Sequence, residues 1–325
     1  MPCIGARQAP HGAIESARPT GGRRTVATRV GVVGLGAMGG GIALTLRKAG
    51  FAVVGHDLRD DLMAELEEAG GERARSPRDV AERCDAVILS LPSAEAFHAV
   101  ATGQGGIAES GRDGLVVFDT STLAVADKEA AAARLRDLGI SLLDCTVSGT
   151  RESVLGGRLV LYASGDRAAY DEIAHVIEGF TQKHWYLGEF GNASRMKYVV
   201  NMLVCINNAA TAEALTFATR MGLDTKQVYD LVAQSFGSSR VWEQRARMAV
   251  EGDYVSARGT YNISRKDAKI IGAEAAAALS PALLFSVALQ MHYSGEAQGF
   301  GGLDTASLYE VYKLAAGLPS SVERD

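Results

Sequence analysis

Cysteine and histidine are scarce in this sequence, and neither is arranged in a pattern that predicts chemistry. The four cysteines are widely scattered and include no Cys-x-x-Cys pair, which argues against a disulfide framework and favours reduced thiols in the cytoplasm. The six histidines form no His-x-His or His-x-x-x-His pair, so we expect no metal site. A Gly-x-Ser-x-Gly motif is also missing, which leaves a hydrolase triad without its usual turn.

An excess of positive charge and long apolar runs are missing as well. The net charge is −5, whereas nucleic-acid-binding proteins usually carry a basic patch, so we expect no nucleic-acid partner. The most apolar window, residues 275–291, is interrupted by Ser280, Pro281 and Gln290. It therefore fits a buried helix better than a membrane span, and we expect no membrane partner.

The chain of 325 residues is long enough for two domains with their own cores, at ~150 residues per domain. Residues 1–28 differ in composition from the rest, because they are rich in arginine and hold one acidic residue, Glu15. They lack the apolar centre of a secretory signal. An arginine-rich, acid-poor segment can resemble a transit peptide, but we favour a disordered tail.

Three closely spaced glycines follow the first apolar run of the chain. The run, residues 30–33, leads into Gly34, Gly36 and Gly39, and a helical pattern comes next. The first glycine would permit a sharp turn, the second would admit a pyrophosphate, and the third would let the helix pack closely on the sheet. The helix N-terminus would offer N–H groups to the phosphates. We therefore predict a dinucleotide site, with a ligand-free βαβ turn as the alternative; no P-loop lysine follows the glycines.

Asp57 bears on the identity of the cofactor. It ends a second apolar run and lies 21 residues after Gly36, close to the ~20 expected for an acid that binds the adenosine ribose. A carboxylate at this position would repel a 2′-phosphate, so the sequence favours NAD over NADP. Arg59 could instead turn towards such a phosphate, although a solvated turn arginine is the interpretation that we favour.

Strand and helix patterns alternate up to about residue 188, and helical patterns follow alone. The first part predicts an α/β domain with a doubly wound, mostly parallel sheet, and the second predicts an all-helical domain. The expected organisation is a tail at 1–28, a dinucleotide-binding Rossmann domain at 29–190, an all-helical domain at 191–317, and a tail at 318–325. Ligands of such sheets bind beyond the carboxyl ends of the strands. The segments expected there are 34–39, 57, 90–92, 119–122 and 145–150.

Polar residues interrupt the apolar pattern of the helix that is expected from about residue 193. Lys197 and Asn201 are four residues apart and therefore share a face. Lys197 could be a solvated lysine at an exposed edge, or a lysine in a cleft whose pKa burial lowers from ~10.4 towards neutrality. Lys266 and Asp267 are expected at the start of a later helix, where Asp267 could serve the helix dipole and Lys266 could be solvated.

Five motifs follow one another along the chain: Gly34–Gly39, Asp119–Thr122, Asp144–Thr150, Gly191–Asn201 and Lys266–Asp267. Together they resemble the β-hydroxyacid dehydrogenases, a family that includes 3-hydroxyisobutyrate dehydrogenase, tartronate semialdehyde reductase and L-threonate dehydrogenase. The resemblance covers residues 29 to about 317 and implies NAD- or NADP-dependent hydride transfer to or from a short 3-hydroxy acid. It also implies a small carboxylate substrate and a homodimer or homotetramer, with residues 191–317 as the substrate and oligomerisation domain.

The resemblance also implies a role for individual residues. Lys197 would be the catalytic acid–base group, and Asn201 would support it. The substrate-binding residues would be Ser121, Ser148, Gly149 and Thr150. The cofactor-binding residues would be Gly34, Leu35, Gly36, Ala37, Met38, Gly39, Asp57, Leu91, Pro92, Thr122 and Lys266.

Two positions depart from the family pattern. Thr146 replaces a proline and Thr150 replaces a glycine in the loop that is expected to bind the substrate. Arg151 follows, and it could pair with a second anionic group or be solvated. These changes leave an imine reductase of the same architecture open as an alternative, although such enzymes usually replace the lysine. A non-catalytic NAD-binding assembly protein is a further alternative, and relatives of that kind typically lose the lysine.

Overall fold

The computed structural model describes residues 28–255 and 259–322. All but the last residue of the predicted tail at 1–28, and the last three residues of the predicted tail at 318–325, lie outside this range. The described chain forms two compact units. We call residues 28–121 and 125–194 the sheet unit, and residues 122–124, 195–255 and 259–322 the helical unit. The predicted domain division between residues 190 and 191 stays a prediction.

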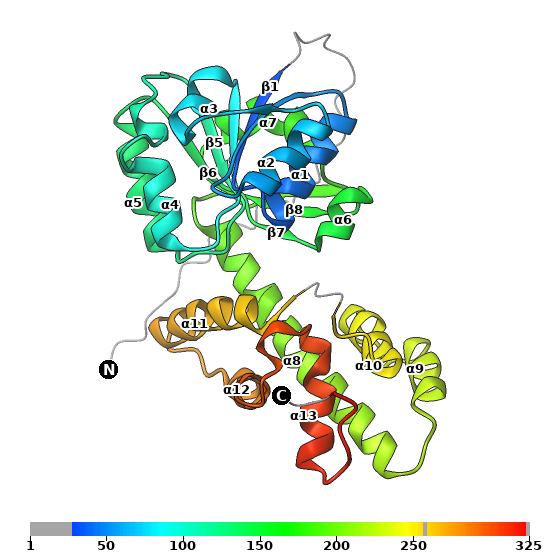
Figure 1. Ribbon diagram of the computed structural model, residues 1–325. Coiled ribbons are helices and arrows are strands. Elements are labelled where there is room, and N and C mark those ends of the chain that lie inside the picture. Colours follow the sequence, from blue (N-terminus) through cyan, green and yellow to red (C-terminus); the bar gives the residue numbers. More distant parts are fainter. Residues whose placement is uncertain (1–27, 256–258, 323–325) are drawn as a thin grey trace, which may run out of the picture. The chain divides into compact units, whose positions relative to one another are not determined.

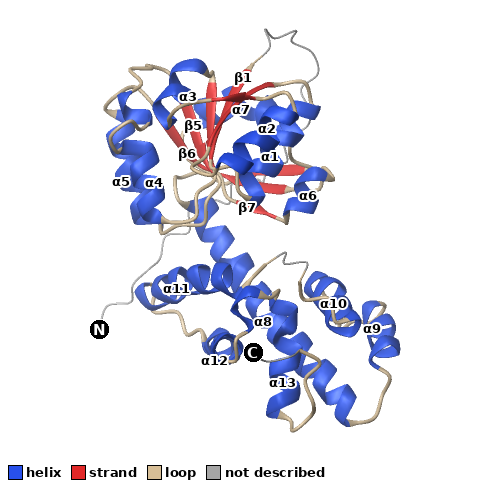
Figure 2. Ribbon diagram, in the orientation of Figure 1, coloured by secondary structure: helices blue, strands red, loops and turns tan. Residues whose placement is uncertain are grey.

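A parallel sheet forms the centre of the sheet unit (Figures 1 and 2). It has six strands in the order β3-β2-β1-β4-β5-β6, and every neighbouring pair is parallel. The chain leaves β1 towards one edge and returns beside it to build the other edge, which confirms the predicted doubly wound fold. The strands are β1 (Arg29–Val33), β2 (Ala52–His56), β3 (Glu72–Arg73), β4 (Ala86–Leu89), β5 (Val116–Asp119) and β6 (Ser141–Asp144).

Helices cover the sheet, and Figure 1 shows α1 and α2 on one side of the strands and α4 and α5 on the other. Alternate strand residues such as Val32, Ile88 and Phe118 join one core cluster with residues of α1 and α7. This alternation arises because successive side chains of a strand point to opposite faces. The helices are α1 (Ala37–Lys48), α2 (Asp60–Glu68), α3 (Pro77–Arg83), α4 (Ala94–Thr102), η1 (Ile107–Glu109), α5 (Val125–Arg136), α6 (Arg151–Leu155) and α7 (Arg167–Glu178).

A second sheet was not expected from the sequence. It contains β7 (Val147–Ser148), β8 (Val160–Ala163) and β9 (Lys183–Tyr186), with β7 and β8 antiparallel. The sequence predicts strands at 159–163 and 185–187, close to β8 and β9, but assigns them to the one mostly parallel sheet. Only two residues separate β6 from β7, whereas a crossover to another parallel strand needs about a dozen. The chain therefore leaves the first sheet after β6.

The helical unit is built along α8 (Asn192–Arg220), a helix of 29 residues whose first three residues belong to the sheet unit. Its core includes Leu215, Trp242, Tyr261 and Phe300. No helix of residues 28–255 and 259–322 is long and apolar enough to cross a membrane. The other elements are α9 (Thr225–Ala233), a π-helical turn (Trp242–Ala246), α10 (Arg247–Glu251), α11 (Tyr261–Ala277), α12 (Leu283–Ala297), η3 (Phe300–Gly302), η4 (Thr305–Ser307) and α13 (Leu308–Ala315).

Candidate active site

The carboxyl ends of five strands lie side by side in the sheet unit. The pairing joins Val33 to both His56 and Leu89, then Leu89 to Asp119, and Asp119 to Asp144. Because these strands are parallel, the segments that follow them all leave the same edge of the sheet. The segments predicted to lie beyond the carboxyl ends of the strands therefore begin at this edge of the sheet.

The three glycines of the first loop have different reasons to be glycine. Gly34 has a φ of +88°, and a Cβ there would lie 2.3 Å from the carbonyl oxygen of Ser90. A Cβ on Gly39 would lie 1.9 Å from the carbonyl oxygen of Gly34. A Cβ on Gly36 would meet no atom of the described residues within 4 Å. Glycine at 34 and 39 is thus required by the fold, whereas at 36 it keeps a space open beside the backbone.

The start of α1 fits a bound pyrophosphate. Its N-cap, Gly36, offers no side chain, and its first turn, which includes Ala37 and Met38, contains no acidic residue. The N–H groups of this turn and the positive end of the helix dipole are therefore left for an anion. Leu35 is buried in the core, so only its backbone is available to this loop.

Asp57 is bonded to the glycine loop. Its Oδ2 accepts the N–H of Leu35 at 2.7 Å, and its Oδ1 accepts the N–H of Arg59 at 2.9 Å. These bonds fix the carboxylate beside the loop, and its contact with a ribose stays a prediction. The Arg59 guanidinium pairs with Asp61 and is two-thirds exposed, which agrees with a solvated turn arginine.

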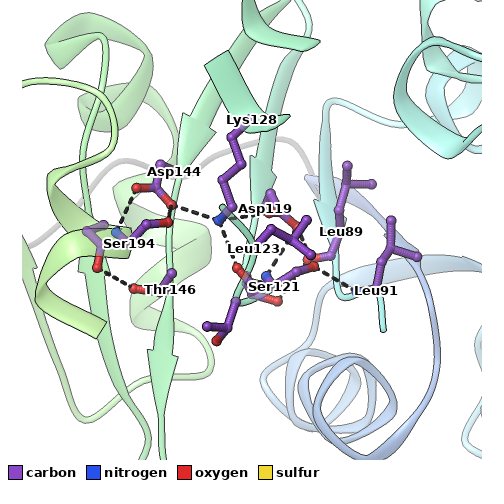
Figure 3. A network of polar contacts seen from close by, with 12 residues as sticks. Leu89, Leu91, Asp119, Ser121, Leu123, Lys128, Asp144, Thr146 and Ser194 are labelled. Atoms are coloured by element: carbon purple, nitrogen blue, oxygen red, sulfur yellow. Dashed lines mark hydrogen bonds and ion pairs between the residues drawn. The ribbon is translucent and has the colours of Figure 1, made fainter. Parts of the chain in front are cut away.

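Ser121 is buried and its hydroxyl makes two hydrogen bonds within the sheet unit, which the sequence does not indicate (Figure 3). It is 5% exposed, its hydroxyl donates to Oδ1 of Asp119 at 2.6 Å, and it accepts the N–H of Leu91 at 2.8 Å. The hydroxyl proton is thus committed to a buried carboxylate. Leu91 is half-buried and Pro92 is exposed, so the predicted cofactor contacts of this loop come from residues at its surface.

The predicted substrate loop contains a short helix that the sequence does not indicate. Gly149 has a φ of +146°, a conformation that side chains disfavour. The Thr150 hydroxyl caps α6 by accepting the N–H of Ser153 at 3.3 Å. Arg151 pairs with Glu65 at 2.5 Å, so its guanidinium already has an acidic partner. Ser148 is half-buried. Its hydroxyl makes no hydrogen bond to another of the described residues, unlike the Thr150 hydroxyl and the Arg151 guanidinium.

Thr146 and Asp144 hold the start of α8. The Thr146 hydroxyl donates to the carbonyl of Ala193 at 2.8 Å. Asp144 accepts the N–H and the hydroxyl of Ser194, both at 2.8 Å. A carboxylate at a helix N-terminus satisfies N–H groups and favours the dipole. Thr146 therefore supplies a bond here that the proline usual in the family could not make.

Lys128 is the residue that the sequence analysis missed. It comes from α5, is fully buried, and lies 2.9 Å from Asp119 and 2.8 Å from Asp144 (Figure 3). It also donates to the carbonyl of Ser121 at 2.8 Å. Burial alone would lower the pKa of Lys128, but the two carboxylates outweigh it and raise the pKa. Lys128 is therefore a permanent cation at the carboxyl edge of the sheet.

Lys197 lies in the second turn of α8. Burial lowers its pKa to about 8, against the opposing charge of Asp267 and with a further lowering by Lys266. One turn on, the Asn201 side chain donates to Asp267 at 2.7 Å. Lys266 lies 3.4 Å from Asp267 and donates to the carbonyl of Thr122 at 2.8 Å. A lysine that titrates near neutrality and a fixed amide are the groups that proton transfer requires.

The positions of Lys266 and Asp267 correct the sequence prediction. We expected them at a helix start, with Asp267 serving the dipole. Instead α11 begins at Tyr261, so both lie in its second turn. Asp267 is thereby placed to bond Asn201, and Lys266 bonds the backbone of Thr122 rather than being solvated.

A cavity of about 190 Å³ lies beside Lys197 within the helical unit. Its walls include Asn201, Asn208, Asp267 and His292. This volume is several times the ~10–15 Å³ that one water needs. His292 is 5% exposed, and neither of its ring nitrogens has a hydrogen-bond partner among residues 28–255 and 259–322. Burial, aided by Arg245, lowers its pKa to about 4. His292 is a single histidine in an apolar helix, so no sequence pattern indicates a role for it.

Known proteins resemble the chain over most of its length. A family model described as the NAD-binding domain of 6-phosphogluconate dehydrogenase matches residues 29–188, and one described as NAD-binding of NADP-dependent 3-hydroxyisobutyrate dehydrogenase matches residues 191–312. The L-threonate dehydrogenase of Escherichia coli K12 is 33% identical over 285 residues, covering 87% of this chain and 94% of that protein. The mitochondrial 3-hydroxyisobutyrate dehydrogenase of Rattus norvegicus is 29% identical over 308 residues, covering 90% and 91%.

A solved structure agrees with these matches. The crystal structure of a 3-hydroxyisobutyrate dehydrogenase from Salmonella typhimurium superposes with a TM-score of 0.80 at 31% identity, covering 87% of this chain and 99% of that one. The glycine loop, the capped start of α8 and the low-pKa lysine fit the same assignment. The chain therefore belongs to the β-hydroxyacid dehydrogenase family, whose members are NAD(P)-dependent oxidoreductases.

Proposed function

We propose that this chain catalyses the reversible oxidation of a short 3-hydroxy acid, with Lys197 as the acid–base group. The observation that carries the assignment is the pKa of Lys197, which burial lowers to about 8. At that value roughly a tenth of the amine is neutral at pH 7, a far larger share than for an ordinary lysine with a pKa of ~10.4, so it can accept a proton and return it. Retention of Lys197 also supports this function over imine reduction and over a purely structural role.

Each residue has one task in the mechanism. NAD, when bound at the glycine loop, supplies the hydride acceptor. Neutral Lys197 takes the proton of the substrate hydroxyl, and in the reverse direction its ammonium group gives the proton back. Asn201 donates to Asp267, so the orientation of its amide is fixed and its carbonyl oxygen remains to accept a bond from the lysine or the substrate.

The substrate carboxylate is assigned to the loop of residues 148–150. The Ser148 hydroxyl and the backbone N–H groups of Gly149 and Thr150 would hold it. Because the Thr150 hydroxyl caps α6, we assign only the backbone of Thr150 to the substrate. Ser121 shapes the neighbouring loop, since its hydroxyl proton is given to Asp119.

Asp57 supports NAD over NADP as the preferred cofactor. Its carboxylate is held beside the glycine loop by the N–H of Leu35, where it would repel a 2′-phosphate. Arg59 does not offset this charge towards the cofactor, because its guanidinium pairs with Asp61.

The test of the proposed activity is absorbance at the reduced-nicotinamide band. The purified protein would be mixed with NAD and, separately, L-threonate, 3-hydroxyisobutyrate, glycerate and 6-phosphogluconate. We expect turnover of at least one of these acids, and faster turnover with NAD than with NADP. Binding of NAD without turnover of any hydroxy acid would contradict the proposal, and turnover of cyclic imines instead would transfer the assignment to imine reduction.

A homodimer or homotetramer in the cytoplasm is also proposed. The described cysteines are free thiols, which suits a reducing compartment. Val199 and Leu203 of α8 are 54% and 53% exposed, and Leu284 and Val287 of α12 are 71% and 66% exposed. Apolar surface of this kind is typical of interfaces between subunits.

Sedimentation velocity tests the oligomer. We expect the wild type to sediment as a dimer or larger, and Leu284→Glu with Val287→Glu to reduce the mass, because two charges would be buried without partners. Gln227→Glu, an added charge on exposed α9, is the control and should leave the mass unchanged. A monomeric wild type would refute the oligomer.

A further inference from the structure

We propose that Lys128 is a positioning residue for the reaction: its buried ammonium group holds both the loop that carries Ser121 and the start of the helix that carries Lys197. This inference rests on the function proposed above. Lys128 itself is fully buried and therefore touches neither substrate nor cofactor.

The ammonium group has three oxygen partners, two through hydrogen bonds and one through an ion pair. It lies 2.8 Å from Oδ1 of Asp144 and 2.8 Å from the carbonyl oxygen of Ser121, and it forms an ion pair of 2.9 Å with Oδ2 of Asp119. Asp119 and Asp144 are register partners at the ends of β5 and β6. One cation thus joins two adjacent strand ends and the loop after the first of them (Figure 3).

One branch of the network leads to the loops at the carboxyl edge. Oδ1 of Asp119 accepts the Ser121 hydroxyl at 2.6 Å, and that hydroxyl accepts the N–H of Leu91 at 2.8 Å. The loops after β4 and β5 are therefore connected to each other through a carboxylate whose other oxygen is paired with Lys128.

The other branch leads to α8. Asp144 accepts the N–H and the hydroxyl of Ser194, each at 2.8 Å, and Ser164 donates to it at 3.2 Å. Ser164 in turn accepts the N–H of Ala193 at 3.0 Å. Lys197 follows Ser194 by three residues on the same helix, so the first turn that Asp144 fixes is joined directly to the turn that carries the acid–base group.

Charge explains why this arrangement depends on Lys128. Asp119 and Asp144 are both 0% exposed, and two buried carboxylates at neighbouring positions repel each other strongly. Without the ammonium group one of them must bind a proton or move away, and either change alters the bonds to Ser121 or Ser194. A displacement of about 1 Å at a reacting group can cost ~10²-fold in rate.

The experiment compares Lys128→Met with Ile173→Ala. Ile173 is buried in α7 of the same unit, and its truncation lowers the stability of the fold, as loss of one partner of a buried ion pair does. Both variants would be assayed where unfolding curves show them folded. We expect Lys128→Met to lower kcat by at least ~10-fold and to move the pKa in the pH profile of kcat/KM, whereas Ile173→Ala keeps both.

A double variant keeps the test decisive if Lys128→Met does not fold. Lys128→Met with Asp119→Asn leaves one buried carboxylate, so the net charge of the cluster equals that of the wild type. It should fold and still show the low kcat, because the bonds from Lys128 are missing. Wild-type kcat in either folded variant, or an equal loss in Ile173→Ala, would overturn the positioning role. Absence of turnover in the wild type would instead overturn the proposed function, and this inference with it.

Discussion

Replacing Lys197 with methionine is expected to lower kcat for oxidation of the hydroxy acid by ~10²–10⁴-fold, the usual contribution of an acid–base group. Methionine preserves the length of the side chain and removes the proton acceptor. The NAD affinity should change little, because the glycine loop and Asp57 that we assign to the cofactor lie in the sheet unit. Initial rates and calorimetric titration with NAD measure the two effects.

The pH dependence of the same variant gives an independent check. Oxidation requires neutral Lys197, so wild-type kcat/KM should rise with pH and level off above a pKa of about 8. Lys197→Met should lose this rise. Folding lowers the pKa of Lys197 to about 8, so below pH 8 the protonated amine destabilises the folded state. Methionine carries no charge, and Lys197→Met should therefore be at least as stable as the wild type at pH 7.

Lys269→Met is the matched control, since Lys269 is an exposed lysine of α11. It should retain the wild-type kcat and pH profile. Near-normal turnover by Lys197→Met, or a rise with pH that survives in it, would show that another group transfers the proton.

Gly36→Ala and Gly39→Ala should have opposite phenotypes although the added methyl group is the same. A Cβ on Gly36 meets no atom within 4 Å in the part of the chain that the structure describes, so the variant should fold with a stability change below about 1 kcal/mol. The methyl group would occupy the space assigned to the pyrophosphate, and the NAD affinity should fall by at least ~10-fold, or about 1.4 kcal/mol.

Gly39→Ala should instead lose stability. Its Cβ would lie 1.9 Å from the carbonyl oxygen of Gly34, so the helix or the loop must move, at a cost of ~1–3 kcal/mol. Chemical denaturation and NAD titration of both variants separate the two effects. Unchanged NAD affinity in Gly36→Ala would contradict a dinucleotide site at this loop.

Local sequence patterns predict most elements of the fold, because strand and helix periods differ clearly. The Ser76–Pro77 start of α3 is an example, with the Ser76 hydroxyl accepting the N–H of Asp79. The second sheet could not be predicted in this way. Whether β8 pairs with β6 or with β7 depends on how the chain turns after Asp144, and strand patterns hold no information about partners.

The candidate site shows the same limit. Lys197 and Asn201 stand out because their spacing puts two polar groups on one face of an otherwise apolar helix segment. Lys128 lies in an alanine-rich helix, where a lysine predicts a solvated face. Its partners, Asp119 and Asp144, come from two different strands, and only the parallel register brings these carboxylates together.

The proposed function depends on hydride transfer from the β-carbon of a hydroxy acid, and isotope transfer follows that step itself. Whichever of the four hydroxy acids turns over fastest would be prepared with deuterium in place of every hydrogen on its β-carbon and incubated with the protein and NAD, and the reduced nicotinamide would be analysed by mass spectrometry. We expect one deuterium in each reduced cofactor, formed at least ~10²-fold more slowly with Lys197→Met. Reduced cofactor without deuterium, or no reduced cofactor from the wild type with any of the four acids, would contradict the proposed function.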